Sequence, residues 1–217
     1  MTHEIHSIAA TTHGRVLVRR ARGGAPRGVL VGFHGYSESA AIQLARLEQI
    51  PGSESWTLIS VQGLHRFYRG RAQEVGASWM TREDREAAIA DNLAYVAAAL
   101  RTIAPAGSRV VYAGFSQGVP MAFRAAVLGP RTGNFEPAGV IGVGGDVPPE
   151  LLADHVSAFP PVLLLRGTHD EWYTAAKFDA DVEALRASGV ALQTVVYDAP
   201  HEWTPAVSEA AGAWLAR

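Results

Sequence analysis

Short runs of aliphatic and β-branched residues alternate along this chain with longer stretches in which alanine and leucine recur at helical spacing. The short runs predict buried strands and the longer stretches predict helices. The expected strands are 28–33, 57–61, 110–112, 139–144, 161–165 and 192–197, and the expected helices are 40–49, 84–103, a segment between 118 and 129, 174–187 and a final segment ending at 215. Strands that alternate with helices predict an α/β fold with a mostly parallel central sheet and helices on both faces.

Three segments fall outside this alternation. Residues 4–9 and 15–20 are separated by Thr-His-Gly and predict an antiparallel hairpin at the start of the chain. Residues 64–80 are irregular and rich in arginine and aromatic residues, which predicts a long loop of functional or mobile character. Residues 129–134 predict a loop that is too short to form a folded lid.

The length of 217 residues and the even composition predict one α/β domain over 1–217, with no cap domain. The N-terminus lacks the charged and apolar segments of a secretory signal, and no uncharged apolar run is long enough to span a bilayer. The expected location is therefore the cytoplasm, and no membrane span is expected.

Composition also narrows the chemistry. A formal charge of −2 with 18% charged residues and no basic stripe argues against nucleic acid as a partner. Cysteine is absent, which excludes disulfides, thiolate metal sites and a cysteine nucleophile. The N-terminal histidines lack the spacing of metal ligands, so no metal or other cofactor is expected.

The segment from Val110 to Gly129 is typical of a strand, a tight turn and a helix, with a serine in the turn. Its Gly114-x-Ser116-x-Gly118 pattern matches the turn that exposes a nucleophilic serine above a sheet. The following helix would direct backbone N–H groups at negative charge that develops there. The alternative is a serine that only caps the helix.

A second motif, His34-Gly35-Tyr36, closes the first of the predicted central strands. Esterase-type sheets take one oxyanion-hole N–H from this loop and the other from the residue after the nucleophile. The candidates are therefore the N–H groups of Tyr36 and Gln117. The alternative is that His34-Gly35 forms only a turn.

An acid and a histidine follow the serine in the order Ser116, Asp170, His201, each just after a predicted strand. This is the Ser, Asp/Glu, His order of enzymes in which histidine activates serine and the acid orients the histidine. Asp146 also follows a strand and is the rival acid, whereas Asp198 is expected to make a local turn bond. Other histidines, His34, His65, His155 and His169, have less suitable positions for the base.

Aromatic residues are frequent near these positions. Trp79, Phe115, Trp172 and Trp203 are the candidate walls of a substrate pocket, with Tyr36 close by. For Trp79 the alternative is that it is the one buried tryptophan of a surface flap. No cluster of arginine and lysine beside the site is evident from the sequence, so an apolar acyl or aryl group is the expected occupant.

The motifs at 34–36, 114–118, 167–172 and 200–202 together resemble the phospholipase/carboxylesterase branch of the α/β-hydrolases, which is similar to acyl-protein thioesterases and dienelactone hydrolases. The resemblance covers the chain from Val29 onward and implies a small hydrolase of carboxylic esters or thioesters. Ser116 stands where dienelactone hydrolases have cysteine. Glu171-Trp172-Tyr173 replaces the Val-Val-Pro of thioesterase relatives, which implies a narrower and more aromatic pocket.

The expected function is hydrolysis of esters with short to medium acyl chains through an acyl-enzyme on Ser116. The alternatives are an acyl thioesterase of the same mechanism and a hydrolase-fold ligand sensor with slow turnover. The expected partner is a small-molecule ester or thioester, and the sequence does not indicate an oligomeric state.

Overall fold

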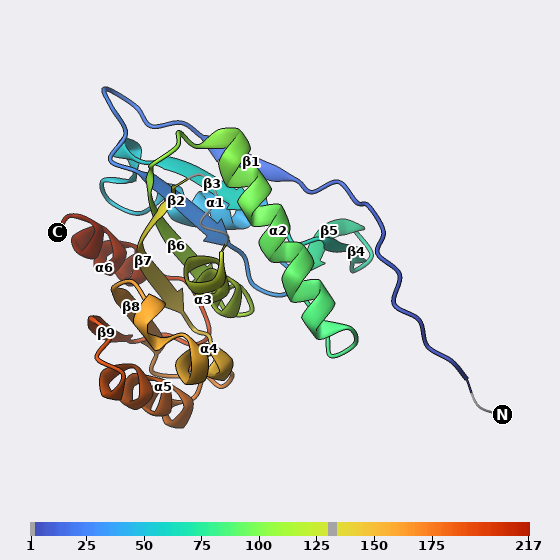
Figure 1. Ribbon diagram of the computed structural model, residues 1–217. Helices are drawn as coiled ribbons and strands as arrows, with labels where there is room; N and C mark the ends of the chain where they lie inside the picture. The colour runs from blue at the N-terminus through green and yellow to red at the C-terminus, as the bar shows by residue number, and fades with distance from the viewer. Residues whose placement is uncertain (1–2, 130–133) are drawn as a thin grey trace.

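The computed structural model describes residues 3–129 and 134–217. A seven-stranded sheet with the order β1-β3-β2-β6-β7-β8-β9 forms its centre (Figure 1). Only β1 runs antiparallel to its neighbour, and the remaining pairs are parallel. The strands of this sheet are β1 (Val16–Arg19), β2 (Val29–Phe33), β3 (Thr57–Val61), β6 (Arg109–Phe115), β7 (Glu136–Val143), β8 (Val162–Gly167) and β9 (Leu192–Tyr197). The predicted α/β class is confirmed.

Helices cover both faces of this sheet (Figure 1). The helices are α1 (Ala40–Glu48), α2 (Arg85–Ile103), α3 (Gly118–Leu128), α4 (Pro149–Asp154), α5 (Ala175–Ala187) and α6 (Pro205–Leu215), with short 3₁₀ turns at Ser53–Ser55 and Val156–Ala158. One face packs against α1 and α6, and the other packs against α2, α3, α4 and α5.

The central strands are apolar on both sides, as strands between two helical layers must be. In β2, for example, Val29, Val31 and Phe33 face the α2 and α3 side, whereas Leu30 faces α1 and α6. All five residues of β2 are buried. Because the side chains on both faces of these strands are apolar and buried, polar residues are expected beyond the carboxyl ends of the strands.

The N-terminal hairpin is not formed. Residues 3–15 contain no strand, and the segment extends away from the sheet (Figure 1). The second half of the expected hairpin becomes β1, which pairs with β3 instead of with residues 4–9. The exposed side chains of Ile5 and Ile8 show why residues 4–9 lack support: they contact no apolar surface that would favour pairing. Of the expected loop at 129–134, residues 130–133 lie outside the described residues.

The segment expected as a long irregular loop forms an antiparallel hairpin of β4 (His65–Arg69) and β5 (Glu74–Ser78). Arginine and aromatic side chains obscured its pattern because most of its residues are exposed rather than alternately buried. An isolated antiparallel bridge joins Ala77 to Glu38. Ser37 N donates to Ala77 O and Ala77 N donates to Glu38 O, both at 2.9 Å. The hairpin therefore supports the loop that follows β2.

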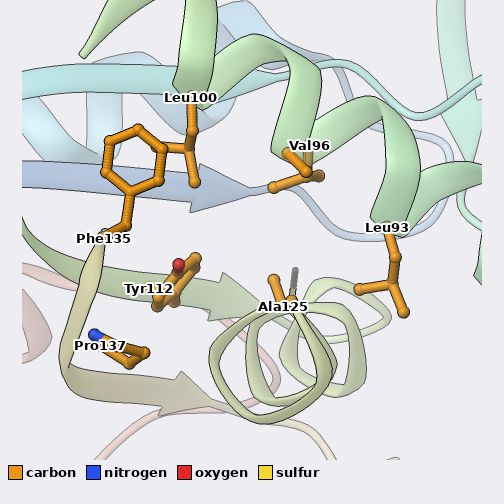
Figure 2. Close-up of a pocket in the computed structure, with 9 residues that line it drawn as sticks. Leu93, Val96, Leu100, Tyr112, Ala125, Phe135 and Pro137 are labelled. Carbon is orange, nitrogen blue, oxygen red and sulfur yellow. The ribbon is translucent and has the colours of Figure 1, made fainter. Parts of the chain in front are cut away.

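A small apolar gap lies between α2, α3 and the start of β7 (Figure 2). Leu93, Val96 and Leu100 point from α2 toward Tyr112 and Ala125 (Figure 2). The gap has a volume of about 20 Å³, so it is an imperfection of core packing and lies apart from the residues considered below. Among the helices of the described residues, none is both long and apolar enough to cross a membrane.

Candidate active site

Ser116 lies in a strained turn between β6 and α3. Its φ of 52° is in the left-handed region that serine rarely adopts. Its N–H donates to Val143 O at 2.9 Å, and its carbonyl accepts from Val119 N at 2.9 Å, so bonds on both sides hold the turn. The strain is therefore maintained by the surrounding backbone.

The two glycines of the motif allow the close approach that this turn needs. A Cβ at Gly118 would lie 2.2 Å from Phe33 O, and one at Gly114 would lie 2.5 Å from Gly118 O. The helix-cap alternative for Ser116 is not supported, because the N-cap of α3 is Gln117. Among the described residues, the Ser116 hydroxyl has no hydrogen-bond partner and remains available for chemistry.

Asp170 and His201 form a short hydrogen bond. The distance from His201 Nδ1 to Asp170 Oδ2 is 2.7 Å. The other carboxylate oxygen, Oδ1, accepts from Trp172 N at 2.9 Å and Tyr173 N at 2.8 Å. Asp170 is 4% exposed. A buried carboxylate fixed in this way holds the proton of His201 on Nδ1 and leaves Nε2 free to act as a base.

The rival residues have other partners. Asp146 is exposed, and its carboxylate lies 3.7 Å from Lys177 Nζ. Asp198 accepts from the Thr168 hydroxyl at 3.1 Å and lies 3.1 Å from His169 Nε2. Neither aspartate contacts His201, so only Asp170 of the three is in a position to orient this histidine.

Ser116 and His201 line the same cleft, which has a volume of about 320 Å³. We call it the aromatic cleft, and its lining consists of Gly35, Tyr36, Glu38, Phe115, Ser116, Trp172 and His201. The ring of Phe115 contacts that of His201 with centroids 5.0 Å apart and the planes tilted by 36°. A carbonyl in this cleft would meet both the serine and the histidine.

Two of the expected pocket residues do not line the cleft. Trp79 is fully buried and donates from Nε1 to His34 O at 2.8 Å, so it belongs to the core beneath the site. Trp203 is 8% exposed and donates to Ser208 Oγ at 3.0 Å. Phe115 and Trp172 do line the cleft, and Trp172 is exposed at its mouth. Sequence proximity to the motifs did not reveal which aromatic rings the core would absorb.

The N–H groups of Tyr36 and Gln117, the candidate oxyanion donors, have no acceptor among the described residues. The side chain of Gln117 is engaged elsewhere: Oε1 accepts from Trp79 N at 3.1 Å, and Nε2 donates to Met80 O at 3.0 Å. Gln117 thus anchors the end of β5 to the turn while its N–H stays free. Two free N–H groups on adjacent loops are what an oxyanion requires.

His34 supports the loop and takes no part as a base. Its Nε2 accepts from Gly63 N at 3.0 Å, and its Nδ1 lies 2.7 Å from Gly35 O. The proton is therefore assigned to Nδ1, which donates to that carbonyl. Burial lowers the pKa of His34, which keeps the ring neutral. His34-Gly35 is thus more than a simple turn, because the ring fixes the loop that contains Tyr36.

An ion pair that was missed in the sequence holds the same loop. Gly35 N donates to Glu38 Oε2 at 2.8 Å, and Arg46 donates to both oxygens of Glu38 at 2.6 and 2.7 Å. The guanidinium of Arg46 also lies over the ring of Phe115, 4.2 Å from its centroid. Arg46 therefore links the loop after β2 to the residue before the serine. Glu38 and Arg46 are eight residues apart, and no sequence motif marks this pairing.

The charge pair perturbs the titration of Glu38. Burial alone would raise the pKa of this carboxyl, but the hydrogen bonds from Arg46 and Gly35 and the charge of Arg46 outweigh it and lower the pKa. Since the folded-state pKa lies below the ordinary value of 4.5, the ionised pair stabilises the fold above that pH. This stabilisation is lost as the pH falls through the folded-state pKa.

We therefore expect Glu38→Gln to lower the free energy of unfolding at pH 7 by about 1–3 kcal/mol, because charge-assisted hydrogen bonds are lost. Thermal melts of the parent and the variant from pH 7 to pH 3 check this. The difference in melting temperature should narrow as the pH falls below 4.5. A difference that stays constant or widens toward acid pH would contradict the assignment.

Ser116 also lines a second cleft. It has a volume of about 450 Å³ and is lined in part by Met80, Arg82, Arg85, Asp146, Tyr173 and Lys177. The expectation of no arginine and lysine cluster beside the site is therefore wrong. The residues come from two distant segments, 80–85 and 146–177, so their convergence is not visible along the sequence. Among the described residues, no three His, Asp or Glu side chains are grouped so that they could hold a metal ion.

Comparison with solved structures identifies the class of fold. The chain is similar to the crystal structure of esterase PE8, with a TM-score of 0.76, 22% identity and coverage of 94% of this chain and 99% of that one. It is also similar to acyl-protein thioesterase 2 of Zea mays, with a TM-score of 0.72, 22% identity and coverage of 94% and 98%. A carboxylesterase of Bacillus cereus gives a TM-score of 0.67 at 17% identity, with coverage of 93% and 92%.

These likenesses show that the chain has the α/β-hydrolase fold. The names of the matching structures are those of the branch that the sequence motifs resemble, and another match is described as a phospholipase/carboxylesterase of Dyadobacter fermentans. No family model matches the sequence. No curated protein matches it either.

Proposed function

We propose that this protein is a serine hydrolase that cleaves carboxylic esters of short to medium acyl chain, with Ser116, His201 and Asp170 as its catalytic residues. The single observation that carries the proposal is the 2.7 Å hydrogen bond between His201 and the buried Asp170, at a cleft that Ser116 also lines. The α/β-hydrolase fold and the esterase names of similar structures support it.

In this mechanism His201 Nε2 removes the proton from the Ser116 hydroxyl as Oγ attacks the ester carbonyl. The N–H groups of Tyr36 and Gln117 donate to the oxyanion that forms. Nε2 then gives its proton to the departing alkoxide oxygen, and an acyl-enzyme remains on Ser116. Water attacks the acyl carbon with His201 as base, which releases the acid and restores the serine.

A thioesterase is the second candidate, and the likeness to an acyl-protein thioesterase favours it. The steps are the same, except that a thiolate leaves. Purified protein should be assayed on p-nitrophenyl esters from acetate to decanoate and on thioesters with the same acyl chains. Higher kcat/KM for the esters supports the esterase, and higher kcat/KM for the thioesters supports the alternative.

A slow-turnover ligand sensor would behave differently in the same assay. It would release one equivalent of p-nitrophenol in a burst and retain the acyl group on the protein. Sustained turnover with no retained adduct would exclude the sensor. Absence of both burst and turnover across the panel, with Ser116→Ala as the blank, would contradict the proposed hydrolase.

The Glu38–Arg46 pair gives a prediction within this mechanism. Glu38→Gln should lower kcat by about tenfold to a hundredfold with KM nearly unchanged, because displacement of the Gly35–Tyr36 backbone weakens a donor that acts in the transition state. Glu74→Gln is the matched control, since Glu74 pairs with Arg69 on the exposed hairpin. Equal effects of the two changes, or a rise in KM alone, would rule out a positioning role.

A further inference from the structure

The two clefts divide at Ser116, and their linings differ in chemistry. The aromatic cleft contains His201 and Tyr36. The second cleft, which we call the basic cleft, contains Arg82, Arg85 and Lys177 but not His201. Ser116 and Trp172 belong to both linings. A substrate bound to Ser116 therefore has a different environment on each side of its carbonyl.

The position of His201 decides which part of an ester occupies which cleft. The departing oxygen must receive a proton from His201 Nε2, so the leaving group lies on the side of the histidine. That side is the aromatic cleft. The acyl chain then extends from Ser116 past Gln117 into the basic cleft, whose volume of about 450 Å³ is sufficient for a short chain.

Positive charge predominates in the basic cleft. Lys177 is partly neutralised by Asp146, 3.7 Å away, and it also donates to Trp172 O at 3.0 Å. Arg82 and Arg85 are exposed, and within the described residues neither forms an ion pair. The acidic neighbours Glu83 and Asp84 are not part of the lining. Arg82 thus has no carboxylate partner among the described residues, whereas the charge of Arg85 also acts on Glu150 and helps to lower the pKa of that carboxyl.

An ion pair between the buried Arg124 and the exposed Glu150 lies beside the cleft and adds no net charge. Arg124 is 1% exposed, and its guanidinium donates to Glu150 at 2.8 and 2.5 Å. Its Nη1 also lies 3.9 Å from the sulfur of Met80, which lines the cleft. Because Arg124 is the direct ion-pair partner of Glu150, and Arg85 acts on that carboxylate by its charge without forming an ion pair, Arg82 and Arg85 keep an attraction for an anion in the cleft.

We propose that the preferred acyl group carries a terminal carboxylate, so that the substrate is a monoester of a short dicarboxylic acid. This inference rests on the proposed function. Arginine presents paired N–H donors that match a carboxylate, and two of them near the end of the acyl chain would favour such a group. The reaction consumes one water, breaks the acyl C–O bond through the Ser116 acyl-enzyme, and yields the diacid and an alcohol.

The test compares three esters with acyl chains of the same length. Phenyl hexanoate is neutral, monophenyl adipate carries a negative charge at the end of its acyl chain, and 4-sulfophenyl hexanoate carries one on its leaving group. Adipate is chosen because its carboxylate is too distant to attack its own ester efficiently. We expect kcat/KM for the adipate ester to exceed that for phenyl hexanoate by about tenfold or more, and the excess to fall as salt is added. In Arg82→Gln/Arg85→Gln the ratio of kcat/KM for monophenyl adipate to that for phenyl hexanoate should fall to about one.

Arg109→Gln/Arg186→Gln is the matched control, because both of these arginines are exposed and outside the two clefts. It should keep the full preference. Equal rates on the adipate and hexanoate esters, a preference that survives in Arg82→Gln/Arg85→Gln, or a preference for the sulfophenyl ester would each overturn the inference and leave the esterase intact. Failure to hydrolyse any ester would overturn the proposed function and this inference together.

Discussion

We expect replacement of Ser116 by alanine to lower the rate of ester hydrolysis by about 10⁴- to 10⁶-fold, because in the proposed mechanism the nucleophile and its base act as one unit. His201→Ala gives a similar loss, since the serine proton then has no acceptor. The Ser116 hydroxyl has no hydrogen-bond partner among the described residues, so its removal should leave stability nearly unchanged. Steady-state kinetics with thermal melting of each variant checks both parts.

The double variant Ser116→Ala/His201→Ala provides the control for this result. Its rate should match that of either single variant, because the serine and the histidine act together and loss of one already abolishes the contribution of the other. If the two losses instead multiplied, the serine and the histidine would contribute independently. That outcome, or substantial activity in Ser116→Ala, would contradict the acyl-enzyme mechanism.

We expect replacement of Asp170 by asparagine to lower kcat by about 10⁴-fold, the scale seen when the orienting acid of a Ser-His-Asp triad becomes an amide. The backbone N–H groups of Trp172 and Tyr173 donate to one oxygen of Asp170. They will retain the amide oxygen of asparagine, which turns the amide NH₂ toward His201 Nδ1. The histidine must then carry its proton on Nε2, where it cannot accept one from Ser116.

Asp146→Asn is the matched control, because Asp146 was the rival acid and contacts Lys177 rather than His201. We expect it to reduce the rate on a neutral ester by less than about threefold. Kinetics of both variants on phenyl hexanoate decides between the two acids. Loss of activity in Asp146→Asn with activity kept in Asp170→Asn would show that the acid is assigned to the wrong residue.

The strand and helix pattern predicted the sheet well because its strands are buried on both faces. The expected bounds of 57–61 and 192–197 agree with β3 and β9 as observed. Local patterns failed where the structure depends on partners far away in the sequence. Residues 15–20 have a strand pattern, but only the contact with β3 determines that this strand lies at the edge of the sheet.

In the candidate site too, features that follow from local sequence patterns could be predicted, whereas features that depend on contacts between distant segments could not. The positions of Ser116 and His201 at one cleft, with Asp170 bonded to His201, follow from the sequence because each residue comes after a strand and parallel strands bring their carboxyl ends together. Trp79 could not be placed, because its burial depends on packing against Phe33 and His34. The Glu38–Arg46 pair and the basic cleft were missed for a related reason. Long charged side chains form contacts that depend on three-dimensional geometry rather than on spacing in the chain.

Intact-protein mass spectrometry after treatment with a fluorophosphonate tests whether Ser116 is an activated nucleophile. We expect one covalent adduct on the parent protein, no adduct on folded Ser116→Ala, and strongly slowed labelling of His201→Ala. An unlabelled parent that is shown to be folded, or an adduct that persists in Ser116→Ala, would contradict this expectation.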